Sequence, residues 1–433
     1  MTAHVFVRKD MGDPVLLVEF SKHEKCFMTC KEHSDTNKPT RHTRTSIIIH
    51  PPTKMATITL VQTSQPCQPT QRIRRDSKSA FASITECITP ESTTCTDKQQ
   101  PHQALMVNQD YQYELSETSH PQLGPHEILL RTKAIGLNPI DWKTVAYKFC
   151  MPSLPWINGR ECAGVIEAVG TAVEDLCIGQ RVWTSTYYRD RRAGCFQELV
   201  VAPEHTVLVL PESLGFEEAA CLGVAGLTAA MTLWKWFDLP MTTPSASSVE
   251  GDRFVLIWGG ATITGQFAVQ IAVEAGLKVI TVASQRMKQR LLDLGTHHVV
   301  VRDGRSLEDI ASEVQQIGQD DIICGVDLVG PQSATFGVGC LSRQQAAKFA
   351  PLAVPAPPID APENVEMVNV EMKRFVLDPA SRKYAVRLTE LVAEGRVVVP
   401  ERLVMDGGLV AVEDGLIRLR SADTGGKKVV VKM

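Results

Sequence analysis

Phe254-Val-Leu-Ile-Trp258-Gly-Gly260-Ala-Thr-Ile-Thr-Gly265 is the stretch of sequence that decides the fold. Its first five residues form an unbroken apolar run, which is typical of a parallel strand buried on both faces. Two glycines then turn the chain. From Gly265 to Ala275 apolar residues recur at helical spacing, and Gly276 is well placed to end that helix. The stretch therefore predicts a strand, a tight turn and a helix.

The same alternation continues downstream. Residues 278–282 read as a second strand, 288–294 as a helix and 299–301 as a third strand. Strands that alternate with helices predict a doubly wound parallel sheet.

Upstream the pattern differs, because short strands follow one another with turn residues between them. They are expected at residues 128–135, 164–169, 181–183 and 196–201. This spacing predicts a small, partly open β-barrel. A helix interrupted near its glycines is expected over 216–237, then a loop over 239–252. From Ser381 the chain returns to a helix and strands and closes with a strand over 427–432.

Composition narrows the class of protein. The 433 residues carry a net charge of −4, with 44% apolar and 6% aromatic residues. A balanced charge does not point to nucleic acid or an anionic membrane surface. The most apolar stretch, residues 219–234, is too short and too weakly apolar to span a bilayer. Twelve scattered cysteines and the absence of a secretory pattern favour a reducing, cytoplasmic compartment.

Residues 1–102 differ from the rest of the chain in composition and in their pattern of apolar residues. The first 100 hold 14 Lys+Arg and 10 Asp+Glu, a local net charge of +4, and few apolar runs. We expect a disordered or loosely appended extension. Cys26, Cys30 and His33 could hold a metal, but a fourth ligand at zinc-finger spacing is missing, so chance is the favoured interpretation.

The turn from Gly260 to Gly265 lies where a dinucleotide pyrophosphate can approach backbone N–H groups and the positive end of a helix. Thr262 replaces the middle glycine of the usual Gly-x-Gly-x-x-Gly pattern, and its hydroxyl and that of Thr264 could themselves donate to phosphate. The alternative is a turn that serves packing only. The flanking strand and helix favour a dinucleotide.

The end of the second strand discriminates between the two nicotinamide cofactors. An NAD site uses a carboxylate there to bind the ribose 2′-hydroxyl. This chain has Ser284-Gln-Arg-Met-Lys288 instead. One hydroxyl and two cations suit a 2′-phosphate, so NADPH is favoured over NADH. The alternative is a solvated helix start with Ser284 as its N-cap.

From about Gln103 to Met433 the chain resembles the medium-chain dehydrogenase/reductase superfamily. The resemblance rests on Ala134–Lys143, which looks like its early substrate-site strand, on Gly159–Gly170, on Gly226–Ala229 and on the stretch from Asp406 to Val429. It is similar above all to zinc-independent fungal trans-acting enoyl reductases of polyketide biosynthesis. The resemblance implies an α/β fold: a GroES-like β-barrel over 103–224, a Rossmann domain over 225–370, and a return to the GroES-like domain over 371–433.

The resemblance also implies a site without metal. In the zinc branch a cysteine and a histidine ligate the ion, whereas this chain has Asn138-Pro139 and Arg160 in those regions. A guanidinium stays protonated and offers no lone pair, so Arg160 cannot bind zinc. The closely spaced cysteines of the structural zinc lobe are also missing, since Cys195 stands alone between Val182 and Phe196.

The resemblance implies particular cofactor and substrate residues. Cofactor contacts are expected from Asn138, Pro139, Ile140, Asp141, Trp142, Gly260, Ala261, Thr262, Ile263, Thr264, Gly265, Ser284, Gln285, Arg286, Met287, Arg302, Leu352 and Ala353. Substrate contacts are expected from Leu222, Gly223, Val224, Ala225, Gly226, Leu227, Thr228 and Ala229. Arg302 stands where the family often has a tyrosine, and residues 346–352 lack the two glycines of the family's nicotinamide strand. No proton donor is assigned; Tyr187, Tyr188 and Lys143 are the reachable candidates.

The expected function is NADPH-dependent, metal-free reduction of an enoyl thioester, with a polyketide synthase as partner and a monomer or homodimer as the assembly. A quinone or ketone reductase on the same fold is one alternative. The other is a non-catalytic NADPH-binding partner of a synthase, which the altered 346–352 stretch favours.

Overall fold

The computed structural model describes residues 100–242, 253–353, 359–422 and 424–433, together with the backbone of five strands nearer the N-terminus. Those strands form a three-stranded antiparallel sheet, β1-β2-β3, and a two-stranded antiparallel pair, β4-β5. Their bounds are His4–Arg8, Val15–Glu19, Lys25–Thr29, Arg44–Ile49 and Ala56–Val61. The predicted disordered extension, and the Cys26, Cys30 and His33 group, lie almost wholly outside the residues whose side chains are described.

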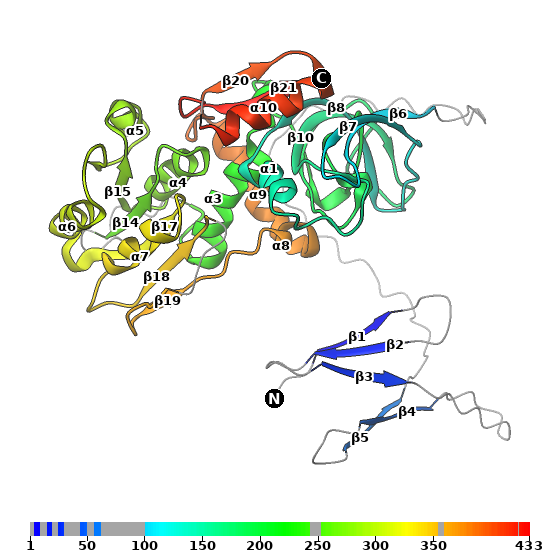
Figure 1. Ribbon diagram of the computed structural model, residues 1–433, viewed down its shortest axis with the longest axis horizontal. Helices are drawn as coiled ribbons and strands as arrows, with labels where there is room; N and C mark the ends of the chain where they lie inside the picture. Colours follow the sequence, from blue (N-terminus) through cyan, green and yellow to red (C-terminus); the bar gives the residue numbers. More distant parts are fainter. Residues whose placement is uncertain are drawn as a thin grey trace, which may run out of the picture. The chain divides into compact units, whose positions relative to one another are not determined.

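The doubly wound sheet has six parallel strands in the order β16-β15-β14-β17-β18-β19 (Figure 1). The strands are β14 (Phe254–Trp258), β15 (Lys278–Ala283), β16 (His298–Val301), β17 (Ile322–Asp327), β18 (Ala347–Pro351) and β19 (Val365–Met367). The helices between them are α4 (Ile263–Glu274), α5 (Lys288–Asp293), α6 (Leu307–Gly318) and α7 (Pro331–Gly339).

Both faces of this sheet are covered, which confirms the prediction from the apolar run. All five residues of β14 are buried, and successive side chains of a strand point to opposite faces. Val255 and Ile257 therefore join one hydrophobic cluster, whereas Phe254, Leu256 and Trp258 join another on the opposite face.

The other main sheet is antiparallel except for one parallel pair, and has the order β13-β11-β10-β8-β21-β20, with β12 also paired to β8. Its strands are β8 (Glu127–Gly136), β10 (Glu161–Val169), β11 (Arg181–Ser185), β12 (Leu199–Pro203), β13 (Val207–Val209), β20 (Arg402–Met405) and β21 (Lys428–Lys432). A smaller sheet beside it holds β6 (His102–Val107), β7 (Tyr113–Thr118) and β9 (Trp156–Ile157). The C-terminal strands β20 and β21 thus belong to the barrel sheet (Figure 1).

One prediction of secondary structure is wrong in part. Residues 134–143 were expected to be a strand, but β8 ends at Gly136 and α1 (Pro139–Ala146) begins three residues later. Pro139 is the reason, because proline fits the first turn of a helix and cannot continue a strand ladder. Asp141 then secures the start of the helix, since its Oδ2 accepts the backbone N–H of Asn138 at 2.8 Å.

The interrupted helix is a core element. It consists of α2 (Phe216–Ala219), a π-helical turn (Leu222–Gly226), α3 (Leu227–Met231) and a second π-helical turn (Thr232–Trp236). The helix is longer than the apolar stretch 219–234, which the sequence marked as too short to span a bilayer, so by length and composition Phe216–Trp236 could cross a membrane. However, 72% of its most apolar window is buried inside the protein. It packs on α4 and on α9 (Arg382–Ala393), so its apolarity is explained by the core.

The remaining helices are α8 (Lys373–Leu377) and α10 (Ala411–Arg420). Helices α3 and α9 lie between the two large sheets (Figure 1). Trp183 of the barrel donates from Nε1 to Thr389 Oγ1 of α9 at 3.3 Å. Arg382 at the start of α9 donates to the carbonyl oxygens of Glu204, His205 and Val207. These bonds tie α9 to the barrel. The boundaries at residues 225 and 370 stay a prediction.

Candidate active site

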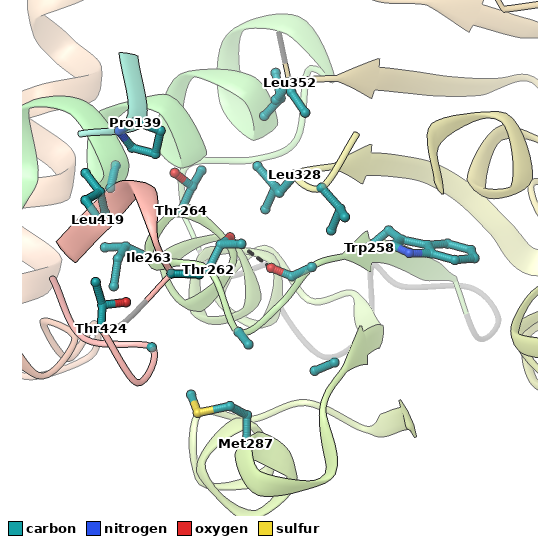
Figure 2. A pocket seen from close by; sticks show the side chains of 18 of the residues that line it. Pro139, Trp258, Thr262, Ile263, Thr264, Met287, Leu328, Leu352, Leu419 and Thr424 are labelled. Carbon is teal, nitrogen blue, oxygen red and sulfur yellow. Dashed lines mark hydrogen bonds between the residues drawn. The ribbon is translucent and has the colours of Figure 1, made fainter. Parts of the chain in front are cut away.

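A cavity of about 630 Å³ opens at the carboxyl ends of the parallel strands and extends to the barrel sheet. Ligands of open α/β sheets bind at these strand ends. In Figure 2, Pro139 and Leu352 lie at one end of the cavity and Met287 lies at the other, with Thr262, Ile263 and Thr264 between them. One elongated ligand in this cavity could therefore contact both the glycine turn and the barrel.

The middle of the cavity is built by the turn between β14 and α4. Gly259 has a φ of +99°, a left-handed conformation that glycine adopts without strain. Thr262 caps the helix, because its Oγ1 accepts the backbone N–H of Gly265 at 3.0 Å and donates to the carbonyl oxygen of Gly259 at 2.8 Å. The N–H groups of Ile263 and Thr264 belong to the first helical turn, where no carbonyl of the helix can accept them. They suit an anion such as a pyrophosphate.

One end of the cavity carries positive charge. Ser284, Arg286 and Arg302 line it, and Met287 forms part of its wall. Ser284 makes no side-chain hydrogen bond to the turn that it precedes, Gln285–Met287, so capping does not account for this serine. Lys288 is exposed and is not among the described residues that line the cavity. Arg302, which directly follows β16, is the second cation that lines the cavity, in place of the predicted Lys288.

Asp303 is a neighbour that the sequence reasoning missed. Its Oδ2 accepts the backbone N–H of Gln285 at 2.6 Å. This carboxylate therefore orders the turn after β15 through the backbone. The chain still has no carboxylate at the end of β15 itself, where an NAD site places one.

The other end of the cavity is mainly apolar. Its predicted residues are Asn138, Pro139, Ile140, Val224, Ala225, Thr228, Leu352 and Ala353, all of which line the wall. Residues 346–352 lack the two glycines of the family's nicotinamide strand, yet the strand forms, as β18, parallel to β17 and β19. An apolar wall with few polar groups is typical of a small-molecule site.

Several predicted residues support the cavity without lining it in the described structure. Gly260 and Gly265 form the turn, and Gln285 is exposed beside it. Asp141 is buried under the start of α1, while Trp142 packs in the barrel cluster beneath Arg420. Five residues of the expected substrate turn face the core or fill the helix interior: Leu222, Gly223, Gly226, Leu227 and Ala229. Helical periodicity is the reason, since one face of a helix reaches a cavity and the other packs.

The C-terminal segment supplies a wall that sequence reasoning missed. The lining residues from it are Leu419, Ala422, Thr424, Gly426, Lys427, Lys428 and Val429. Gln266 of α4 donates from Nε2 to the carbonyl oxygen of Gly426 at 3.0 Å, which holds this segment against the glycine turn. The Gly-Gly-Lys-Lys pattern before β21 marked the family but gave no sign of its position in the site.

A charged cluster lies beneath the substrate end. Glu161 is fully buried, and its Oε1 accepts from Asn138 Nδ2 at 2.7 Å and from Lys428 Nζ at 2.5 Å. Its Oε2 accepts the backbone N–H of Val224 at 2.7 Å. Lys428 also donates to Asn138 Oδ1 at 2.7 Å. The Nδ2 and Oδ1 atoms of the Asn138 amide thus both form hydrogen bonds to protein groups.

Burial shifts the pKa values of neighbouring groups. It raises the pKa of Asp141 to about 7, an effect that the positive charge of Arg160 opposes. Burial lowers the pKa of Arg160, whose guanidinium carbon lies 5.2 Å from the centre of the Tyr188 ring. Among the candidate proton donors, Lys143 lines the cavity and burial lowers its pKa, whereas Tyr187 and Tyr188 pack against each other with tilted rings and are not among the described lining residues.

The donor set does not resemble a metal centre. Within the described ranges, no three His, Cys, Asp or Glu side chains gather as a ligand group. Arg160 is a hydrogen-bond donor and cannot act as a ligand.

Comparisons with known proteins agree with this geometry. The alcohol dehydrogenase GroES-like domain model matches residues 124–212. A trans-enoyl reductase of Aspergillus japonicus, himH, is 29% identical over 345 residues, which cover 76% of this chain and 98% of that protein. The crystal structure of CurK enoyl reductase has a TM-score of 0.65 at 21% identity, covering 77% of this chain and 99% of that one. For Escherichia coli quinone oxidoreductase complexed with NADPH the TM-score is 0.62 at 19% identity, with coverages of 77% and 99%.

The GroES-like barrel, the six-stranded parallel sheet and the cavity between them are the architecture of a medium-chain dehydrogenase/reductase, and the chain is similar to this superfamily of oxidoreductases. Within the superfamily it is related to the fungal trans-enoyl reductases. The predicted superfamily and fold class are therefore confirmed.

Proposed function

We propose that the chain is an NADPH-dependent, metal-free enoyl reductase that acts on an α,β-unsaturated thioester in polyketide biosynthesis. One observation carries the proposal. A single cavity joins the N-terminus of α4 and the cations Arg286 and Arg302 to an apolar end at Val224 and Leu352. Fungal trans-enoyl reductases among the relatives support this substrate class.

The residues fit NADPH. The free N–H groups at the start of α4 suit the pyrophosphate, and Ser284, Arg286 and Arg302 suit a 2′-phosphate. A Cβ on Gly265 would lie 2.5 Å from the carbonyl oxygen of Gly259, so the close approach of turn and helix requires glycine there. Bound NADPH would supply a hydride to the β-carbon of the substrate.

The chain's own task is to position the thioester and to shield the carbon that receives the hydride. The apolar wall at Ala225 and Leu352 keeps water from the β-carbon and leaves the α-carbon open to a proton from solvent. Asn138 is held by Glu161 and Lys428, which makes the polar floor of this end rigid. A rigid pocket that aligns two reactants accounts for much of the rate of such a reaction.

The test measures NADPH consumption with 2-enoyl thioesters of N-acetylcysteamine or pantetheine, with NADH, saturated alcohols and quinones as comparisons. We expect turnover of the enoyl thioester with NADPH and a weaker rate with NADH. Rapid quinone reduction with no enoyl turnover would assign the chain to the quinone reductases instead. NADPH binding without turnover of any activated alkene would assign it a non-catalytic role beside a synthase.

The cellular setting is part of the same proposal. We infer a cytoplasmic enzyme that meets a carrier-bound intermediate on a polyketide synthase, because the relatives include trans-acting reductases and the chain offers no basic field for nucleic acid or lipid. Co-purification with a synthase and size-exclusion measurements on the pure chain, expected to give a monomer or homodimer, test the partner and the assembly.

A further inference from the structure

The ammonium group of Lys428 is enclosed by the protein at the floor of the cavity. Its side chain is 2% exposed, and that of its ion-pair partner Glu161 is fully buried. Lys428 is also a lining residue of the cavity, together with its other partner Asn138. A lysine that is buried by protein atoms and still faces a ligand cavity differs from an ordinary surface lysine, which remains hydrated.

The chain makes room for this ion pair. A Cβ on Gly136 would lie 2.6 Å from Glu161 Oε1, and a Cβ on Gly223 would lie 2.7 Å from the Glu161 Cβ. Taking two charges out of water is costly, and apolar residues of the same volume often stabilise a protein as well or better. Stability alone therefore does not explain a buried cation at the floor of the site.

The hydrogen bonds leave Lys428 with one N–H to offer. An ammonium has three donors. In the part of the chain that the structure describes, two oxygens accept from Lys428 Nζ, at 2.5 Å from Glu161 and 2.7 Å from Asn138. Glu161 accepts from Lys428, Asn138 and the Val224 backbone, and as a carboxylate it is an acceptor only, so it orients the ammonium and does not compete with it as a donor to a substrate carbonyl.

The position of Lys428 indicates which part of a ligand it meets. Asn138, which accepts from Lys428, and Val224, which donates to Glu161, both line the apolar end of the cavity. Met287 marks the opposite end in Figure 2. The cations suited to a 2′-phosphate belong there, because Arg286 directly precedes Met287 in the chain and the backbone N–H of Arg302 donates to Ala283 at the end of β15. A cation at the apolar end is placed to stabilise a substrate group that becomes negative during the reaction.

We propose that Lys428 is a catalytic residue that donates its remaining N–H to the thioester carbonyl oxygen of the substrate, with Glu161 and Asn138 as its positioning residues. This assignment rests on the proposed function. As the β-carbon gains a hydride, the electron pair of the C=C bond moves toward the carbonyl carbon, and the carbonyl oxygen becomes an enolate oxygen. Lys428 stabilises that charge without giving up its proton, and the α-carbon then takes a proton from solvent.

The decisive variant removes the pair rather than one partner. Lys428→Met combined with Glu161→Gln replaces both charged groups with neutral ones of similar size, so no unpaired charge stays buried. We expect its kcat to fall about 100-fold or more, the usual loss for one oxyanion donor, with NADPH affinity within about threefold of wild type. Lys432→Met, an exposed lysine of the same strand, is the matched control and should leave kcat unchanged.

A second measurement does not depend on turnover. A β-ketoacyl thioester of pantetheine ionises to an enolate that absorbs in the ultraviolet, and it is not reduced at a C=C bond. In the presence of NADP⁺, the wild-type protein should increase the enolate absorbance of the bound thioester, and the double variant should not. Thermal unfolding of both proteins establishes that the variant is folded.

The outcomes separate the two proposals. A wild-type protein without enoyl turnover would overturn the proposed function and this assignment with it. Wild-type turnover with equal kcat in the folded double variant would overturn the assignment of Lys428 alone. A large loss of NADPH affinity at unchanged kcat would place Lys428 in cofactor binding and would also overturn it.

Discussion

Gly260 lies directly against Thr281. A Cβ on Gly260 would stand 1.9 Å from Thr281 Oγ1, and that hydroxyl in turn donates to the carbonyl oxygen of Ile257 at 2.7 Å. The glycine turn before α4 is therefore held against β15 by contact as well as by the backbone. Strand β15, which contains Thr281, therefore fixes the position of the glycine turn in the middle of the cavity.

Gly260→Ala should destabilise the protein, because neither the turn nor the buried Thr281 has space to move. We expect a loss of about 1–3 kcal/mol in the free energy of unfolding, measured by urea denaturation. Thr281→Ala makes room, so Gly260→Ala should cost less in that background, which a double-mutant cycle measures. Gly339→Ala is the control: no atom lies within 4 Å of its added Cβ. Equal losses at both glycines would contradict the contact.

Thr262→Ala should weaken the start of α4 and the binding of NADPH together. The substitution removes the acceptor of the Gly265 N–H, and loss of an N-cap costs about 1 kcal/mol. Thr262→Ser keeps the oxygen and should restore both properties. Titration of NADPH fluorescence measures binding, and urea denaturation measures stability. If the alanine variant bound NADPH and unfolded like wild type, Thr262 would contribute to neither property.

Arg286→Ala and Arg302→Ala should reduce the affinity for NADPH but not for NADH. Each guanidinium lines the cationic end of the cavity, and loss of one charged hydrogen bond to phosphate corresponds to about a tenfold weaker Kd. Calorimetric titration with both cofactors measures the difference. If the affinities for NADPH and NADH fell equally, these arginines would not bind the 2′-phosphate, and the predicted preference for NADPH would be contradicted.

Asp141→Asn should change how stability depends on pH. Burial raises the pKa of the Asp141 carboxyl from 3.8 to about 7. Between these values the folded state holds a proton that the unfolded state has released, so wild-type stability falls as pH rises, by at most about 1.4 kcal/mol per pH unit. The asparagine side chain does not titrate, so the variant lacks this pH dependence of stability. Its stability relative to wild type should therefore increase from about pH 4 to pH 7 and then level off.

Urea denaturation at several pH values measures that difference. The same substitution at the exposed Asp414 controls for the loss of a carboxylate. A constant difference between Asp141→Asn and wild type across this range would mean that the buried carboxyl does not gain a proton.

The fold was predictable because its signals are local. The apolar run of β14, the glycines after it and the helical spacing of α4 lie within about twenty residues, and short-range sterics and burial decide their structure. The proposed pyrophosphate contact follows from the same stretch, since the first N–H groups of a helix have no acceptor within the helix. Where local signals conflicted, as at Pro139, the expected strand gave way to a helix.

The catalytic half depended on tertiary structure. Asn138, Glu161 and Lys428 are separated by up to 290 residues, yet one ammonium bridges the other two side chains. By itself the sequence determined the two sheets, the turn that suits a pyrophosphate and the unsuitability of Arg160 as a metal ligand. Only the packing of β21 beside β8 decided that a lysine near the C-terminus lies at the floor of the cavity, because strand pairing between distant segments is set by the burial of the whole sheet.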